Sequence, residues 1–220
     1  NNMSINKKIF ITGASGGIGS AICKKFVDKN FILVLTSSSE NKISQLKKEY
    51  GDKHYYYKID LSNPENVQNC LDDISKVHKD ISIIVNNAGK THDNLIFRMK
   101  NDQWNTVLQT NLNSNYQIIK SLLPNMLSNK YGKIVGISSI VGSTGNPGQA
   151  NYVASKSGLV GLYKSIALEV AKRNINVNII SPGFISTSMT DNLNEDQKKN
   201  YLSRIPMMRF GSPIDIANLV

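Results

Sequence analysis

Short runs rich in β-branched residues alternate along the chain with longer segments of helical period, and this alternation restricts the fold more than any other feature. Strands separated by helices pair in parallel, because neighbouring parallel strands need a long crossover connection. The run Ile81–Val85 is almost continuously apolar, which is typical of strands covered on both faces. The sequence therefore predicts an α/β fold with a doubly wound parallel sheet and helices on both faces. The expected strands are Ile9–Thr12, Phe31–Thr36, His54–Ile59, Ile81–Asn86, Lys133–Ser138 and Asn176–Ser181.

Length and hydropathy indicate one domain that spans residues 1–220. Hydrophobic residues make up 40% of the chain, which suffices for a full-sized core. No apolar run approaches the roughly 20 residues that cross a bilayer, and the first residues lack the apolar stretch of a secretory signal. We expect a cytoplasmic protein of bacterial type, or a plastid or other organellar protein if a targeting peptide preceded Met3. A helix expected from Pro213 has no strand after it, so the sheet should lack a final edge strand.

The net charge of +10 raises the question of a nucleic-acid partner. The Lys residues are scattered along the expected helices without a basic block, which favours a solvated surface and argues against nucleic-acid or membrane binding. A basic surface also attracts acidic proteins, including a small acidic carrier protein. Cys23 and Cys70 form no C-x-x-C pair, and His54, His78 and His92 share no ligand spacing, so we expect no metal site.

A glycine-rich turn, Thr12–Gly19, follows the first expected strand and precedes a helix. As a phosphate cradle it would use Gly13 for the tight turn, Gly17 for close approach of a pyrophosphate, and Gly19 for packing of helix on strand. The same letters fit the G-x-S-x-G elbow of hydrolases, but a hydrolase needs a later His and none occurs after His92. A third alternative is a helix start without a ligand, although so many glycines disfavour an ordered backbone. The pattern favours the phosphate cradle.

Tyr152 and Lys156 lie one helical turn apart in a segment that is otherwise small and apolar. A phenol with a pKa near 10 is a weak acid–base catalyst, and lowering that pKa by ~3 units needs about 4 kcal/mol of preferential stabilisation of the phenolate. A neighbouring ammonium can supply much of it. The pair would be ordinary on a solvated helix face, but an apolar helix should be buried, where an unpaired Lys is unfavourable. Ser138 and Ser139 end the preceding strand and place a hydroxyl at the carboxyl edge, where such sheets bind ligands.

Several motifs in combination resemble the short-chain dehydrogenase/reductase superfamily over essentially the whole chain. They are the Thr12–Gly19 turn, Asn86-Asn87-Ala88-Gly89, Asn111, Ser139, Tyr152 with Lys156, and Pro182-Gly183. Within that superfamily the chain is similar to the 3-oxoacyl-(acyl carrier protein) reductases of bacterial-type (type II) fatty acid synthesis. The segments that carry this second resemblance are Asn94–Met99, Gly145–Tyr152 and Pro182–Ile185.

The resemblance implies a Rossmann-type fold and a catalytic group of Ser139, Tyr152, Lys156 and Asn111. Tyr152 would donate a proton to the ketone oxygen, and Ser139 would hold that oxygen. Lys156 would bind the nicotinamide ribose and lower the pKa of Tyr152, while Asn111 would position a water of the proton relay. The residues implied to bind the cofactor are Gly13, Ser15, Gly16, Gly17, Ile18, Gly19, Ser37, Ser38, Asp60, Leu61, Asn87, Ala88, Gly89, Tyr152, Lys156, Pro182, Gly183, Ile185 and Thr187.

The cofactor implied is NADPH. An acidic residue at the end of the second strand would bind the 2′-hydroxyl of NAD, whereas this chain has the neutral Thr36-Ser37-Ser38, which tolerates a phosphate. Many relatives carry an Arg at the position of Gly16 that would face the phosphate. We therefore expect weaker discrimination between NADPH and NADH, with Lys42 as a partial substitute.

The function implied is NADPH-dependent reduction of 3-oxoacyl-(acyl carrier protein) to the 3-hydroxyacyl product in fatty acid biosynthesis, by a homotetramer. The carrier protein would dock on Lys130 and Arg173 near the entrance of the active site, and residues 185–209 would form a mobile lid over the substrate. Two alternatives stay open: a short-chain reductase of a coenzyme A thioester or another small ketone, and a nucleotide-binding scaffold without turnover. The complete catalytic group argues against the scaffold.

Overall fold

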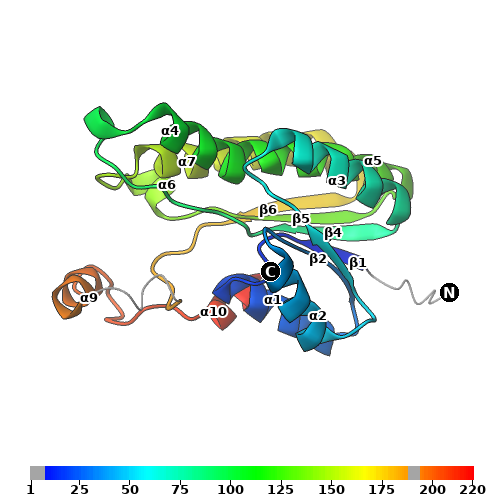
Figure 1. The fold of residues 1–220 in the computed structure, drawn as a ribbon, viewed down its shortest axis with the longest axis horizontal. Coiled ribbons are helices and arrows are strands. Elements are labelled where there is room, and N and C mark those ends of the chain that lie inside the picture. Colours follow the sequence, from blue (N-terminus) through cyan, green and yellow to red (C-terminus); the bar gives the residue numbers. More distant parts are fainter. Residues whose placement is uncertain (1–7, 188–193) are drawn as a thin grey trace.

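A parallel sheet of six strands forms the centre of the computed structural model, which describes residues 8–187 and 194–220 (Figure 1). Its strand order is β3-β2-β1-β4-β5-β6. Each predicted strand is present, with its ends within one residue of the prediction, and the doubly wound, Rossmann-type fold is confirmed. The strands are β1 Lys8–Ile11, β2 Ile32–Ser37, β3 Tyr55–Lys58, β4 Ile81–Asn86, β5 Gly132–Ile137 and β6 Ile175–Ile180.

Helices cover both faces of the sheet, as Figure 1 shows. Alternate side chains of each strand point to opposite faces, so Ile9 and Ile11 pack with one helical layer and Phe10 with the other. The first layer is α1 Gly17–Asp28, α2 Glu40–Tyr50 and α10 Pro213–Leu219. The second is α3 Pro64–Val77, α4 Asn101–Leu108, α5 Ser114–Asn129 and α7 Ala150–Val170, with the short α6 Val141–Thr144 beside it. Outside these layers lies α9 Glu195–Leu202, while the 3₁₀ turn Ile96–Arg98 precedes α4 and the 3₁₀ turn Ala171–Arg173 follows α7.

Burial on both faces, predicted for the strands in general, holds for the inner strands and not for the outer ones. Every residue of β1 and β4 is buried. Tyr55 and Lys58, at the ends of β3, are exposed, as are Asn176 and Asn178 of β6. The physical reason is position, because an edge strand has a neighbour on one side only.

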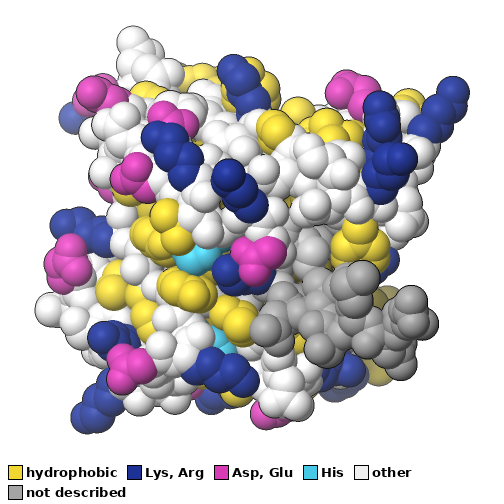
Figure 2. Space-filling model, turned by 90° about the vertical axis from the view of Figure 1, so that its right-hand side faces the viewer, with side chains coloured by type: hydrophobic (Ala, Val, Ile, Leu, Met, Phe, Trp, Pro, Cys, Tyr) yellow, Lys and Arg dark blue, Asp and Glu magenta, His cyan; other side chains and the backbone are white. Residues whose placement is uncertain are grey.

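Basic and acidic side chains are spread over the face that Figure 2 shows, with Lys and Arg interspersed among Asp and Glu. In the described part of the chain, no helix is both long and apolar enough to span a membrane. Within residues 8–187 and 194–220, no three His, Cys, Asp or Glu side chains gather closely enough to hold a metal ion. Cys23 and Cys70 lie on α1 and α3, as predicted, and both are free thiols.

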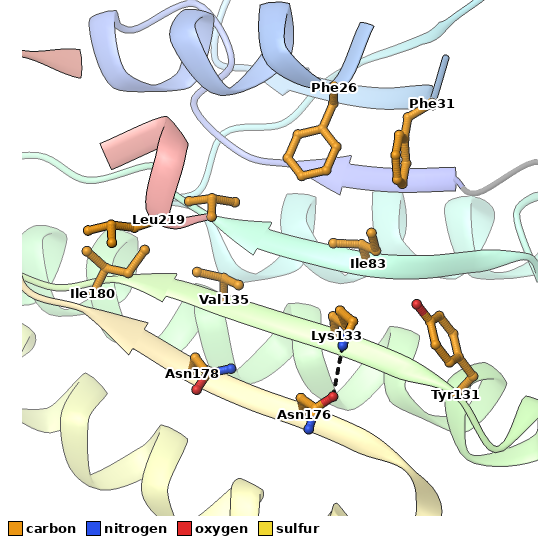
Figure 3. A pocket seen from close by; sticks show the side chains of 11 residues that line it. Phe26, Phe31, Ile83, Tyr131, Lys133, Val135, Asn176, Asn178, Ile180 and Leu219 are labelled. Carbon is orange, nitrogen blue, oxygen red and sulfur yellow. Dashed lines mark hydrogen bonds between the residues drawn. The ribbon is translucent and has the colours of Figure 1, made fainter. Parts of the chain in front are cut away.

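A pocket of about 340 Å³ opens on the sheet face beside α10 (Figure 3). Ile83, Val135 and Ile180 project into it from the sheet, and Leu219 borders it from α10. Lys133 and Asn176 also line the pocket, and the Lys133 Nζ donates a hydrogen bond to the side-chain oxygen of Asn176 at 2.9 Å. None of the predicted site residues lines this pocket, so the candidate site lies elsewhere.

Candidate active site

The candidate site lies at the carboxyl ends of β1 and β4, where the strand order reverses. Thr12 follows β1, and its Oγ1 accepts hydrogen bonds from the backbone N–H groups of Asn87 and Ala88 at 3.1 and 3.0 Å. The Asn87 side chain donates in return to the carbonyl oxygens of Thr12 and Gly13, both at 3.1 Å. These four bonds fix the turn after β1 against the turn after β4.

The glycine-rich turn after β1 leaves no room for larger residues. Gly13 has a φ of +64°, and a Cβ there would lie 2.9 Å from the Cα of Ala88. A Cβ on Gly19, in the first turn of α1, would collide with the Gly13 carbonyl oxygen. Gly16 is the N-cap of α1 and has no side chain that could accept a hydrogen bond from the N–H groups at the start of this helix. A helix N-terminus of this kind suits a phosphate group, and the residues present therefore fit a dinucleotide.

The ends of β2 and β3 extend the same edge of the sheet. The hydroxyls of Ser15 and Ser37 are hydrogen-bonded at 3.0 Å, and Ser38 beyond them is exposed. After β3, the Asp60 carboxylate accepts hydrogen bonds from the backbone N–H and the hydroxyl of Ser62, and these bonds lower its pKa. The predicted cofactor residues along this stretch are Ser15, Ser37, Ser38, Asp60 and Leu61.

Tyr152 and Lys156 occupy successive turns at the start of α7. The Lys156 Nζ lies 5.5 Å from the centroid of the Tyr152 ring and donates to the Ile137 carbonyl oxygen at 2.7 Å. Ser139, shortly after β5, is hydrogen-bonded through its side chain to Tyr152. The Ser138 hydroxyl donates to the Lys156 carbonyl oxygen at 2.8 Å, which attaches the end of β5 to α7.

Burial is the largest influence on the pKa values of Tyr152 and Lys156. Burial raises the pKa of Tyr152, and the hydrogen bond with Ser139 opposes this rise, while the charge of Asp93 adds to it. Burial also lowers the pKa of Lys156 to about 8. The resemblance implied that Lys156 lowers the pKa of Tyr152, whereas the net shift here is upward, because burial outweighs the hydrogen bond with Ser139. A lowering by Lys156 stays a prediction for the enzyme with cofactor bound.

Asn111 lies in a π-helical turn, Gln109–Asn113, between α4 and α5, and is fully buried. Its Nδ2 donates to the Ser155 hydroxyl and to the Lys90 carbonyl oxygen, both at 3.0 Å, and its Oδ1 accepts from the Lys90 N–H at 2.9 Å. A Cβ on Gly89 would lie 3.3 Å from the Lys156 Nζ and 3.5 Å from the Asn111 Oδ1. The four residues of the predicted catalytic group therefore lie around one point at the carboxyl edge.

This geometry agrees with the comparison to known families. The family model described as short chain dehydrogenase matches residues 7–198. The chain belongs to the short-chain dehydrogenase family.

Curated relatives are similar to this short-chain dehydrogenase over nearly its whole length. A 3-oxoacyl-[acyl-carrier-protein] reductase of Buchnera aphidicola subsp. Acyrthosiphon pisum is 42% identical, over 99% of this chain and 90% of the relative. The Haemophilus influenzae protein of the same name is 43% identical, over 97% of this chain and 88% of the relative. A third, from Rickettsia bellii, is 44% identical, over 96% and 86%.

The segment after β6 returns to the candidate site of this short-chain dehydrogenase. The Ile140 N–H donates to the Pro182 carbonyl oxygen at 2.9 Å, and Ile185 forms a β-bridge with Gly211. A Cβ on Gly17 would lie 3.1 Å from the Thr187 Cγ2, so Thr187 faces the glycine-rich turn. A cavity of about 350 Å³ lies between this segment and α6. It is lined by Ile140, Val141, Thr144, Gly145, Asn146, Phe184, Tyr201 and Arg204.

Lys130 and Arg173, on which the carrier protein is predicted to dock, lie away from Tyr152 within one subunit. Lys130 ends α5 just before β5, and Arg173 lies just before β6. Both are exposed, and the side chain of Asn174 donates to the Lys130 carbonyl oxygen at 3.3 Å, which keeps the two segments together. Because parallel strands start at the same edge, these residues lie at the amino edge of the sheet, opposite the edge that carries Tyr152. Docking on them stays a prediction.

Two polar residues that support Tyr152 were missed by the sequence reasoning. The Ser155 hydroxyl donates to the Tyr152 carbonyl oxygen at 2.7 Å. The Asn151 Oδ1 accepts from the Tyr152 N–H at 2.7 Å, and its Nδ2 donates to the carbonyl oxygens of His92 and Gln103. Both residues flank Tyr152 closely in the sequence, and small polar residues in an otherwise apolar helix were the available signal.

Proposed function

We propose that this short-chain dehydrogenase reduces the ketone of 3-oxoacyl-(acyl carrier protein) to the 3-hydroxyacyl product in fatty acid biosynthesis. The observation that carries the proposal is the convergence of Ser139, Tyr152, Lys156 and Asn111 beside the glycine-rich turn. The substrate is inferred from the three relatives, each of which has the name 3-oxoacyl-[acyl-carrier-protein] reductase. A cytoplasmic location and a homotetrameric assembly belong to the same proposal.

The turn from Gly13 to Gly19, the ends of β2 and β3, Asn87 to Gly89 and Pro182 to Thr187 would hold the nicotinamide nucleotide. The chemistry that NADPH supplies when bound is hydride for the carbonyl carbon. The neutral Ser37 and Ser38 support NADPH over NADH, because neither repels a 2′-phosphate.

Each member of the catalytic group has a distinct part in the proposal. Tyr152 donates its phenolic proton to the ketone oxygen, and Ser139 donates a hydrogen bond that holds this oxygen in place. Lys156 holds the nicotinamide ribose and favours the phenolate that Tyr152 becomes. Asn111 positions a water that returns a proton to the relay. The cavity beside α6 and the segment 185–209, of which residues 188–193 lie outside the described structure, would accommodate and cover the substrate.

Adding NADPH with acetoacetyl-coenzyme A to the purified protein and following the nicotinamide absorbance tests the activity directly. We expect loss of absorbance that depends on both compounds. Binding of NADPH without turnover on this or any carrier-linked 3-oxoacyl substrate would favour a scaffold and refute the proposal.

Cofactor choice has a separate test. Ser37→Asp places a carboxylate where the 2′-phosphate is proposed to lie, so we expect kcat/KM for NADPH to fall and the preference to shift toward NADH. Steady-state rates with both cofactors measure the shift. An unchanged preference would mean that the phosphate binds elsewhere.

A further inference from the structure

Three buried polar side chains form a chain of hydrogen bonds behind the candidate site. Asn86 ends β4, Tyr163 lies on α7 and Asn115 lies on α5. The Asn86 Nδ2 donates to the Tyr163 hydroxyl, and this hydroxyl donates to the Asn115 Oδ1, both at 2.8 Å. The side chains are 1%, 2% and 3% exposed, so water does not replace these bonds if they are lost. Polar groups buried this deeply are costly without hydrogen bonds, and here only the Asn86 Oδ1 of the three side chains has no partner among the described residues.

The chain continues to Asn111. The Asn115 Nδ2 donates to the Asn111 carbonyl oxygen at 2.9 Å. This carbonyl belongs to the π turn, in which the Ser114 N–H reaches back five residues to the Gln109 carbonyl oxygen. A π turn disturbs the regular i+4 bonding of a helix, and such turns are frequent at functional sites. The Asn115 side chain thus supplies a bond to the backbone where helical bonding is irregular.

The same chain reaches Tyr152 through the Asn111 side chain. Asn111 donates to the Ser155 hydroxyl at 3.0 Å, and Ser155 donates to the Tyr152 carbonyl oxygen at 2.7 Å. One connected network therefore joins the end of β4, the π turn and the first turn of α7.

The chemistry of the groups determines which one donates and which one accepts in each hydrogen bond of the network. The Asn111 carbonyl can only accept, so Asn115 must present its NH₂ group to it and its Oδ1 to Tyr163. Tyr163 has a single hydroxyl proton, which it must donate to Asn115, and it must therefore accept from Asn86. Burial raises the pKa of Tyr163, so the proton that this arrangement needs is retained. A Cβ on Gly136 would lie 2.5 Å from the Tyr163 ring, which shows that β5 leaves a slot for the ring itself.

We propose that Tyr163 and Asn115 are positioning residues that fix the π turn and, through it, the orientation of Asn111 and Tyr152. This inference rests on the proposed function for its effect on turnover, and on the hydrogen bonds alone for its effect on structure. Neither residue touches the reacting atoms, and both act through Asn111.

The test uses Tyr163→Phe, Asn115→Leu and the double variant in the full chain. Tyr163→Phe keeps the ring in its slot and removes only the hydroxyl. We expect kcat with acetoacetyl-coenzyme A to fall about tenfold in each single variant, since small displacements of catalytic groups have large effects on rate, while KM for NADPH changes less than about twofold. We expect Tm to fall in both single variants and to fall in the double variant by less than the sum of the two, because the double variant leaves unpaired only the Asn86 Nδ2 and the Asn111 carbonyl oxygen.

Turnover in the double variant separates positioning from stability. Positioning requires kcat to stay low there, because the Asn111 carbonyl still lacks its Asn115 partner. A kcat that returns to the wild-type value in the double variant would overturn the proposal. Tyr57→Phe is the matched control, because it removes a hydroxyl bonded at 2.8 Å to the His78 ring, away from the site. We expect it to lower Tm and to leave kcat unchanged.

Hydrogen exchange provides a readout that needs neither substrate nor cofactor. In Tyr163→Phe we expect faster amide exchange in residues 109–116 and 151–156, and in Tyr57→Phe no change in either segment. Unchanged exchange in both segments of Tyr163→Phe would also overturn the positioning role. A wild-type protein that reduces no ketone would refute the proposed function only, because the exchange data still decide whether Tyr163 orders the π turn.

Discussion

Tyr152 is subject to opposing influences on its protonation, since burial holds its proton and the hydrogen bond with Ser139 favours its release. Tyr152→Phe keeps the ring in its packing and removes the transferable proton. We predict that NADPH binding is retained and that turnover falls by at least about a hundredfold, in line with the usual contribution of general acid catalysis. Fluorescence titration of NADPH together with steady-state rates measures both quantities. Retention of more than about a tenth of wild-type turnover would exclude Tyr152 as the proton donor.

Lys156 is the most deeply buried of the basic groups at the site, and its charge is unfavourable to folding. Its pKa in the folded protein is about 8, below the ordinary value of 10.5, so between these two values the unfolded chain binds more protons than the folded chain. The contribution of Lys156 to the stability of the wild type should therefore rise with pH across this window, by on the order of 1 kcal/mol per pH unit. Lys156→Met removes the titrating group, so we predict that this variant lacks the rise.

Urea unfolding of wild type and Lys156→Met at several pH values between about 8 and 10 measures the difference in the free energy of unfolding. Lys164→Met is the matched control, because it removes the same side chain from an exposed position of the same helix. A difference between wild type and Lys156→Met that does not change with pH would contradict the burial argument.

At the level of elements, the strands were predictable and the π turn was not. Apolar runs locate buried strands to within a residue, because burial on both faces leaves few positions for polar side chains. The turn Gln109–Asn113 has no comparable signal, since its polar residues would suit an ordinary helix end or a surface. The role of Asn111 came only from the family resemblance. Its partners Asn115 and Tyr163 come from α5 and α7, and only the folded chain brings these helices together.

The close packing of the glycine-rich turn, in contrast, was predicted from the sequence. A Cβ on Gly19 would collide with the Gly13 carbonyl oxygen, which is backbone and can move only if the whole turn moves. We predict that Gly19→Ala lowers Tm and weakens NADPH binding at least about tenfold, because the turn is displaced from the start of α1. Thermal unfolding and fluorescence titration measure the two effects.

The control for Gly19→Ala is Gly161→Ala on α7. A Cβ there meets nothing within 4 Å, so the substitution should raise helix stability slightly. If Gly19→Ala behaves like this control in both measurements, the close packing of the turn has no influence on cofactor binding.

At the scale of the whole molecule, the position of Lys130 and Arg173 determines which subunit could react with a carrier protein that docks on them. Both lie at the amino edge of the sheet, so a carrier bound there cannot present its substrate to Tyr152 of the same subunit without crossing the length of the strands. The predicted parallel sheet already implied this position, because residues that directly precede parallel strands all lie at its amino edge. If these residues do receive the carrier, the subunit that reacts must be a neighbour in the proposed tetramer.

Lys130→Glu with Arg173→Glu should raise KM for the carrier-linked substrate about tenfold, and more at low salt, because ions screen attraction between opposite charges. KM for acetoacetyl-coenzyme A should stay within about twofold, since the catalytic group is untouched. Equal losses on both substrates would indicate damage to the fold, and no loss on either would remove these residues from docking.

Mixed oligomers test whether docking and reaction belong to different subunits. Subunits with Tyr152→Phe keep the docking residues but lack the proton donor, whereas subunits with Lys130→Glu and Arg173→Glu have the reverse defect. We predict that tetramers refolded from a mixture of the two recover a low KM for the carrier-linked substrate, because an intact docking surface then serves an intact site next to it. Each variant alone provides the baseline. If the mixture shows only the activity of the docking-deficient subunits, a carrier bound at the amino edge delivers nothing to a neighbouring site, and docking must take place at the carboxyl edge.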